Sequence, residues 1–251
     1  MAKKPAPRRA EGASSPSSVI LRHPPSVILA EGQNPEAPQG APNPSSVILA
    51  EGQNPEAQPG APGKEALRRR LLSNRAATSN DERARRDAAR LKLAWPLLTD
   101  AAPGVVAIYL SAPGEPGTLA LAARLRDAGV RLLVPAPGPG DAPWRQPAWT
   151  WYDAAPVDGP FGVPVSPGEQ LPSHALARAD VVIVPGLAGS PAGDRLGRGG
   201  GWYDRALADA PTSPRWLLLN DDEVLAALPR EPHDARVNRL VTPSRVIACD
   251  W

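Results

Sequence analysis

Cysteine is nearly absent from this chain, and its absence excludes several kinds of protein. Cys249 is the single cysteine among 251 residues. An intrachain disulfide framework and a zinc or iron–sulfur site built from several cysteines are therefore both excluded. This usage is typical of a reducing compartment, and we predict a cytoplasmic location.

Long apolar runs and an excess of positive charge are also missing. No run approaches the roughly 20 apolar residues that span a bilayer. The basic segment 1–18 is not followed by the unbroken apolar stretch of a secretory signal. Lys and Arg total 28 against 26 Asp and Glu, which disfavours a nucleic-acid binder driven by bulk charge. We expect neither a membrane nor a nucleic acid among the partners.

Proline, by contrast, is in excess, at 33 of 251 residues, or about 13% against a background near 5%. Part of the excess lies in residues 1–63, which contain no aromatic residue and balance five basic residues against five Glu. The segment SVILAEGQNPEA occupies residues 26–37 and recurs at 46–57, a period of 20 residues. Two full units broken by Pro and Gly are too few for a solenoid. The apolar surface is also too small to offset chain entropy, so we predict a disordered tail over 1–63.

An alternative hypothesis is that each Val-Ile-Leu triplet of this tail adds a strand to a partner protein. Deletion of residues 1–60 tests this hypothesis. Loss of a co-purifying partner or a change of location would support docking, whereas no change in either would refute it.

From Lys64 the composition shifts toward Ala, Leu and Arg. Leu67 and Leu71 have helical spacing, and Ser79 followed by Glu82 predicts an N-terminal capping box. We therefore expect two helices that are separated near Thr78.

Further along, the chain alternates strand and helix patterns. Apolar runs of strand length occupy 104–110, 131–135, 181–186 and 216–220, with a short one near 240–241. A helix over 118–129 is predicted to end at Gly129. Continuously apolar strands that alternate with helices indicate a mainly parallel sheet covered on both faces. The predicted fold class is α/β, a three-layer αβα Rossmann-like domain over 64–251 that follows the tail.

A glycine-rich loop, RLGRGGGWYD at 195–204, comes shortly after the 181–186 run and leads into a helical pattern. Consecutive glycines let backbone N–H groups converge on an anion. Arg195 and Arg198 add fork-shaped donors for phosphate oxygens, and Asp204 is suited to hold a divalent metal. The pattern is neither a Walker A motif nor a dinucleotide fingerprint. By itself it supports phosphate binding and a plain flexible loop about equally.

Four ordered motifs resemble those of the 5-formyltetrahydrofolate cyclo-ligase family. They are KEALR at 64–68, SAPGEPGT at 111–118, VPGLA with the glycine-rich loop at 184–204, and PREPHD at 229–234 followed by VTP at 241–243. The resemblance covers essentially residues 64–251.

The resemblance implies an MgATP-dependent ring closure that converts 5-formyltetrahydrofolate into 5,10-methenyltetrahydrofolate and releases ADP and phosphate. ATP would phosphorylate the formyl oxygen, N10 would attack the activated carbon, and phosphate would leave. Such a reaction depends on positioning and on neutralising phosphate charge more than on acid–base groups. ATP and a reduced folate are the implied partners, Mg²⁺ is the implied cofactor, and we expect a monomer.

The resemblance also implies roles for individual residues at the nucleotide. Lys64 and Arg68 lie on one helix face at i, i+4 spacing and would contact ATP phosphates. Arg195, Arg198 and Tyr203 would be catalytic. The complete ATP-binding set would be Lys64, Arg68, Arg195, Leu196, Gly197, Arg198, Gly199, Gly200, Gly201, Trp202 and Tyr203.

Metal and folate contacts are implied in the same way. Asp204 and Asp234 would hold Mg²⁺, and His233 would contact a phosphate or a metal ligand. Glu115 would accept hydrogen bonds from the amino and ring N–H groups of the pterin. The substrate-binding set would be Leu110, Glu115, Arg198, Gly199, Gly200, Gly201 and Trp202. Leu110 as a core residue, and Trp202 and Tyr203 as residues that pack the loop on the sheet, are the alternatives.

Three departures from the family pattern stand out. Gly189-Ser190 follow P-G-L-A where an apolar residue and Asp are usual, and Trp202 replaces Tyr or Phe. The segment FGVPVSP at 161–167 lacks the family's Glu and is one residue longer. They leave two other hypotheses: an ATP-using paralogue that acts on another small molecule, and a non-catalytic reduced-folate-binding protein.

Overall fold

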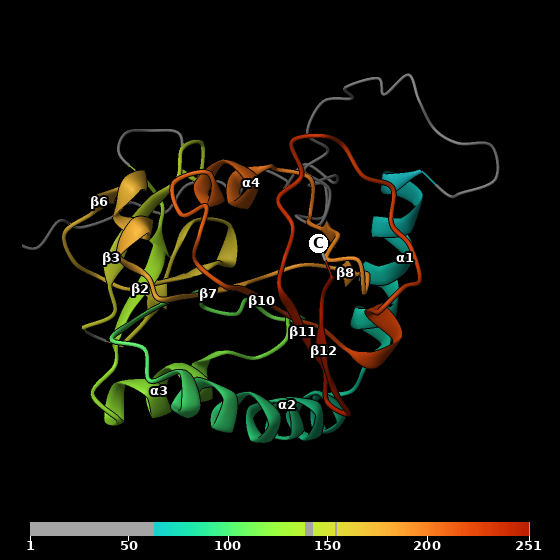
Figure 1. Ribbon diagram of the computed structural model, residues 1–251, viewed down its shortest axis with the longest axis horizontal. Coiled ribbons are helices and arrows are strands. Elements are labelled where there is room, and N and C mark those ends of the chain that lie inside the picture. The colour runs from blue at the N-terminus through green and yellow to red at the C-terminus, as the bar shows by residue number, and fades with distance from the viewer. Residues whose placement is uncertain (1–62, 139–142, 154, 251) are drawn as a thin grey trace, which may run out of the picture. The chain divides into compact units, whose positions relative to one another are not determined.

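The computed structural model describes residues 63–138, 143–153 and 155–250. Residues 1–62 of the predicted tail, with its repeat, lie outside the described residues. Within these ranges eight strands form one sheet in the order β12-β11-β10-β7-β1-β2-β3-β6 (Figure 1). The strands are β1 (Val105–Ile108), β2 (Arg131–Ala136), β3 (Ala148–Trp151), β6 (Leu171–Pro172), β7 (Val181–Val184), β10 (Arg215–Leu218), β11 (Arg239–Val241) and β12 (Val246–Ala248).

The centre of the sheet is parallel, and its edges are not. Strands β11, β10, β7, β1 and β2 pair in parallel, whereas β12 and β3 run antiparallel to their inner neighbours. The five parallel strands are those predicted from apolar runs, which confirms the α/β class. The short strands β3, β6 and β12 were not predicted.

Helices cover both faces of this sheet (Figure 1). Helices α2 (Asn80–Ala101) and α3 (Leu119–Asp127) pack on one face, where they meet Val106 and Ile108 of β1. Helix α4 (Trp202–Leu207) and the 3₁₀ segment η2 (Ser173–Arg178) pack on the other, where Ala107 points. The alternation along β1 follows the period of two that a strand buried on both faces requires.

Helix α1 (Lys64–Ala77) and α2 are separate, as predicted. The Ser79 hydroxyl accepts a hydrogen bond from the Glu82 backbone N–H at 3.3 Å, which caps α2 where the sequence placed the cap. Helix α3 ends at Asp127, and Ala128 is its C-cap. Gly129, the predicted end, follows with φ of +85°, the left-handed conformation that glycine adopts most readily.

Helix α1 packs on two short antiparallel strands, β8 (Ala188–Gly189) and β9 (Arg195–Leu196), rather than on the large sheet (Figure 1). Leu67 and Leu71 form a small apolar cluster with Leu187, Ala188 and Leu196. This contact brings the first turns of α1 beside the glycine-rich loop.

Smaller elements complete the described part of the chain. These are β4 (Val157–Asp158), β5 (Pro164–Val165), and the 3₁₀ segments η1 (Pro160–Gly162) and η3 (Asp221–Glu223). Among the described helices, none has the length and apolar character that a membrane crossing requires.

The unusual Gly189 is explained by packing. A Cβ at this position would lie 2.8 Å from a Leu240 methyl and 3.0 Å from methyls of Leu217 and Leu219. Ser190 is fully buried, and its hydroxyl donates to Asp194 at 3.0 Å. Glycine is therefore the residue that this close approach of β8 to the sheet accommodates.

We expect Gly189→Ala to destabilise the fold by about 1–3 kcal/mol, because three leucine methyls must move to admit one extra carbon. Urea unfolding measures the loss. Gly63→Ala is the matched control, because a Cβ at Gly63 meets nothing within 4 Å. Equal stability of the two variants would contradict the packing explanation.

Candidate active site

A cavity of about 370 Å³ opens where the parallel strands β1, β2 and β7 end. The carboxyl edge of such a sheet is where α/β proteins place their sites. All the residues that the resemblance implied line this cavity: Lys64, Arg68, Leu110, Glu115, Arg195, Leu196, Gly197, Arg198, Gly199, Gly200, Gly201, Trp202, Tyr203, Asp204 and Asp234. Helix α1, the loop after β1, the glycine-rich loop and the segment before β11 therefore meet at one place.

Lys64, in the first turn of α1, is paired with the segment before β11. Its Nζ donates to Oδ2 of Asp234 at 2.8 Å and lies 3.3 Å from Oε2 of Glu231. Burial alone would raise the pKa of Asp234, but the hydrogen bond from Lys64 and one from the Glu231 backbone N–H outweigh it and lower that pKa. Asp234 is thus held as a carboxylate in the cavity wall.

Arg195 makes the second such pair, within the glycine-rich loop. Its Nη2 donates to Oδ1 of Asp204 at 2.5 Å, and its Nη1 donates to the Pro185 carbonyl at 3.3 Å. The Ala235 backbone N–H also donates to the same Asp204 oxygen at 3.2 Å. The Arg195 side chain is only 3% exposed, so its charge depends on this carboxylate.

Arg68 fixes the backbone of the glycine-rich loop. Its Nε donates to the Gly197 carbonyl at 3.0 Å. Gly199 has φ of +105°, and a Cβ there would lie 3.4 Å from the Arg68 guanidinium carbon. The loop therefore lies directly against one of the predicted phosphate-binding cations.

The family-model comparison now decides the relationship. Residues 61–243 match the model of the 5-formyltetrahydrofolate cyclo-ligase family. The chain belongs to the 5-formyltetrahydrofolate cyclo-ligase family.

Relatives of known name agree with this assignment. The chain is 35% identical to the 5-formyltetrahydrofolate cyclo-ligase of Mycolicibacterium smegmatis over 188 residues, which cover 73% of this chain and 95% of the relative. It is 32% identical to the Escherichia coli K12 cyclo-ligase over 150 residues, 56% of this chain and 79% of the relative. The family resemblance seen in the sequence is therefore confirmed, and this protein is an enzyme of the ligase class.

Solved structures match the fold as well. The NMR structure of Aquifex aeolicus 5,10-methenyltetrahydrofolate synthetase matches with a TM-score of 0.63 and 26% identity, over 75% of this chain and 93% of that one. The Mycoplasma pneumoniae 5,10-methenyltetrahydrofolate synthetase matches with a TM-score of 0.58 over 72% of this chain and 99% of that one. At 17% identity, the second match supports the fold alone.

Glu115 and Arg198 form an ion pair in the lining of the cavity. Oε1 of Glu115 lies 3.2 Å from Nε of Arg198, and Oε2 accepts from the Ala112 backbone N–H at 3.0 Å. The Arg198 side chain is 53% exposed, whereas that of Glu115 is 13% exposed. Because Arg198 is the better hydrated partner, it is the one that a ligand of Glu115 displaces more readily.

Aromatic rings form one side of the cavity. Trp202 and Tyr203 contact each other edge to face, with centroids 4.8 Å apart, and both contact Trp149 of β3 at 5.3 and 6.5 Å. Both residues therefore do pack the loop on the sheet. Their polar atoms, Trp202 Nε1 and Tyr203 Oη, are buried and have no hydrogen-bond partner among the described residues. Buried donors of this kind favour a ligand that pairs with them.

Leu110 lies both in the cavity wall and in the core. It lines the cavity, yet it is only 3% exposed and belongs to the cluster under α2 and α3. Leu110 therefore has both of the roles considered from the sequence, a lining residue of the cavity and a core residue.

Several lining residues were not identified from the sequence. Tyr109 lines the cavity and donates its hydroxyl to the Pro116 carbonyl at 2.8 Å, while burial raises its pKa. Trp144, Gly186 and Glu231 also line it. Gly186 and Glu231 lie inside the VPGLA and PREPHD motifs, so those motifs could have identified them as site residues.

The carboxylates fit a hard divalent cation. Asp204 and Asp234 both line the cavity, and carboxylate oxygen is the donor that Mg²⁺ prefers. Glu231, His233 and Asp234 each offer a ligand atom within 4.8 Å of the others. Asp204 is not part of that group. Asp234 therefore has two neighbouring donors, Glu231 and His233, that the sequence did not assign as metal ligands.

We expect Tyr203 to remain protonated throughout pH 6–10. Burial, and then the negative charge of Glu115, raise its pKa well above 10. The hydroxyl therefore acts as a hydrogen-bond donor and not as a base. Tyr203→Phe should lower kcat by about tenfold, the effect of one lost hydrogen bond, and leave the shape of the pH–rate profile unchanged. An alkaline decline below pH 10 that disappears in Tyr203→Phe would refute this role.

Proposed function

We propose that this protein uses MgATP to cyclise 5-formyltetrahydrofolate to 5,10-methenyltetrahydrofolate and releases ADP and phosphate. The observation that carries the proposal is the meeting of Lys64, Arg68 and Arg195 with the carboxylates of Asp204 and Asp234 in one cavity that Glu115 also lines. A protein that only binds folate has no use for such a set. ATP use, the metal and the products belong to the proposal.

The cationic side chains account for the phosphoryl-transfer half of the reaction. Arg68 contacts the glycine-rich loop, Arg195 belongs to it, and Lys64 lines the same cavity. The three would neutralise the phosphate oxygens and align the terminal phosphate with the formyl oxygen. Mg²⁺, when held by Asp204 and Asp234, would neutralise further phosphate charge. Lys64 and Arg195 would then exchange their present carboxylate partners for phosphate oxygens.

Glu115 and the aromatic residues of the cavity account for folate binding. Glu115 would accept hydrogen bonds from the pterin after Arg198 leaves it, and Tyr203 and Trp202 would donate their unpartnered groups. Once the formyl oxygen carries the phosphoryl group, N10 attacks the formyl carbon and gives up its proton. The carbon–oxygen bond then breaks and phosphate leaves. Glu115, Tyr203 and Trp202 would hold the folate so that N10 lies close to that carbon. Such positioning supplies most of the rate gain in reactions of this kind.

The hypothesis of a paralogue with another substrate loses one of its two supports. Neither Gly189 nor Ser190 lines the cavity, and packing explains the glycine. Only the missing Glu of the 161–167 segment still favours it, since Val163 and Pro164 do line the cavity. The cytoplasmic location and the monomeric state stay predictions from the sequence.

The deciding experiment follows absorbance in the methenyltetrahydrofolate band. Purified full-length protein is mixed with 5-formyltetrahydrofolate and MgATP, with controls that lack ATP or contain EDTA. We expect the band to grow only with ATP and metal together. A flat trace from folded protein that binds ATP would instead support the paralogue.

We expect Asp204→Asn to lower turnover at least about 100-fold, because the metal loses a charged ligand. The same variant should need more Mg²⁺ to reach its own maximum. It should also melt earlier, because Arg195 keeps an oxygen acceptor but loses the charge that compensates its burial.

Turnover is therefore compared per folded molecule, with exposed Asp127→Asn as the control. A fully active Asp204→Asn with unchanged Mg²⁺ dependence would remove Asp204 from the metal site.

A further inference from the structure

Behind the cavity runs a buried polar network that no step of the proposed reaction uses. Its members come from α1, α2 and the end of β10, and it reaches both walls of the cavity. They are Arg75, Asp87, Arg90, Asn220 and Glu223. Arg75, Arg90 and Glu223 are 5%, 2% and 2% exposed, so each charge depends on its partner inside the protein.

Asp87 holds the wall that carries Glu115. Its Oδ1 accepts from the Gly117 backbone N–H at 2.9 Å and from Nη1 of Arg90 at 2.5 Å. A Cβ at Gly117 would lie 2.3 Å from Oδ2 of Asp87, so only glycine allows this approach. Asp87 of α2 thus anchors the loop backbone at Gly117, two residues after Glu115.

Arg75 holds the part of the cavity lining at Gly186. It donates to both carboxylate oxygens of Glu223 at 2.6 and 2.8 Å, and its Nη2 also donates to the Gly186 carbonyl at 2.6 Å. Gly186 lines the cavity, and a Cβ there would lie 3.4 Å from Cγ of Arg195. The backbone that supports a phosphate-binding arginine therefore rests on Arg75.

Arg90 and Asn220 join the two anchors. Arg90 donates to the Leu219 carbonyl at 3.1 Å and to Oδ1 of Asn220 at 3.0 Å. The backbone and side-chain N–H groups of Asn220 donate to Glu223 at 2.8 and 2.9 Å. The contacts are continuous from Gly117 to Gly186.

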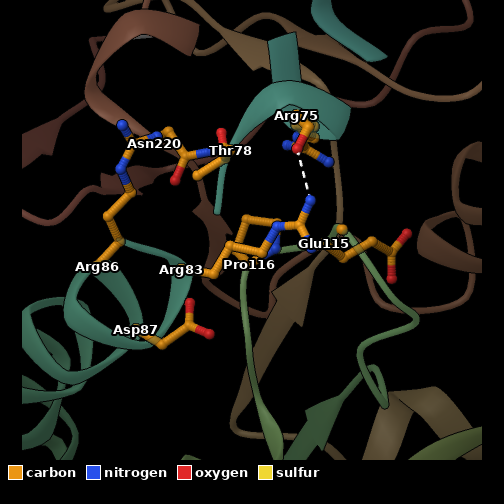
Figure 2. A pocket seen from close by; sticks show the side chains of 9 residues that line it. Arg75, Thr78, Arg83, Arg86, Asp87, Glu115, Pro116 and Asn220 are labelled. Carbon is orange, nitrogen blue, oxygen red and sulfur yellow. Dashed lines mark hydrogen bonds between the residues drawn. The ribbon is translucent and has the colours of Figure 1, made fainter. Parts of the chain in front are cut away.

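Figure 2 shows the crevice on the network side of the Glu115 loop, between the end of α1 and the first turns of α2. Arg75, Asp87 and Asn220 surround it, and Arg83 donates to the Arg75 carbonyl at 2.8 Å. The Glu115 side chain points away from this group. The network thus contacts the backbone of the Glu115 loop, while the Glu115 carboxylate lines the cavity.

We propose that Asp87 and Arg75 are positioning residues, Asp87 for the folate wall at Glu115 and Arg75 for the phosphate wall at Gly186. Naming the two ligands rests on the proposed function. The buried guanidinium groups of Arg75 and Arg90 offer fixed donors to Glu223, Asn220 and the half-buried Asp87. Fixed contacts of this kind hold backbone to within the fractions of an ångström that such a site needs. Each residue therefore controls the binding of a different ligand.

Steady-state kinetics of two variants test this division. Asp87→Ala should raise the KM for 5-formyltetrahydrofolate on the order of tenfold and leave the KM for MgATP within about twofold. Arg75→Lys keeps the charge beside Glu223 but gives up the fork that reaches Gly186. It should raise the KM for MgATP and leave that for folate unchanged.

Conservative and control variants complete the set. Asp87→Asn should recover part of the folate KM, because its amide oxygen can still accept from Gly117. Glu82→Gln, which removes the charge from two surface ion pairs on the same helix, with Arg85 and Arg86, should behave as wild type. Equal rises in both KM values for either variant, or a lower melting temperature with both KM values unchanged, would overturn the positioning role.

Hydrogen exchange of the ligand-free protein separates this proposal from the reaction itself. Asp87→Ala should speed exchange in residues 111–118 and not at Leu187, whose N–H is bonded to the Leu196 carbonyl at 2.7 Å. Arg75→Lys should do the reverse. A wild-type protein without methenyltetrahydrofolate production would refute the proposed function alone, and unchanged or uniform exchange would refute the network.

Discussion

The site depends on one constraint: charges of both signs are held close together in a partly desolvated cavity. Each is tolerable there because a group of opposite sign lies beside it. Lys64 pairs with Asp234, Arg195 with Asp204 and Arg198 with Glu115. In the proposed function, ligand binding would be an exchange of partners, in which phosphates and metal replace pairs that already exist.

The fold supplies this arrangement through two different contacts. Parallel strands bring the loops after β1 and β7 to one edge of the sheet, which places Glu115 near Gly186. Helix α1 is not part of the three layers, and its leucines instead pack on β8 and β9. That apolar contact, together with the hydrogen bonds of Arg75, brings Lys64 and Arg68 to the glycine-rich loop. Stability and function therefore share the same small cluster.

Family membership and geometry answer different questions about this protein. The relatives establish that it is a cyclo-ligase of the folate type. The geometry explains why departures such as Gly189 need not alter the chemistry, since that residue packs under leucines away from the cavity. It also identifies residues that the motifs do not mark, such as Asp87 and Arg75, which hold the cavity walls from behind.

The sequence by itself determined the parallel strands and the Ser79 cap, because each is written in local periodicity or in a compact motif. The family motifs also named much of the cavity lining, but not Tyr109 or Trp144, which lie outside those motifs. The sequence did not reveal β3, β6 and β12, which are only two to four residues long and lie at or near the sheet edges. Nor did it distinguish the buried Arg75 and Arg90 from the exposed arginines of the same helices. Their partners, Glu223 and Asn220, lie 148 and 130 residues further along the chain. Only the tertiary structure decides such pairs, because burial and not local pattern selects which charges must find a partner.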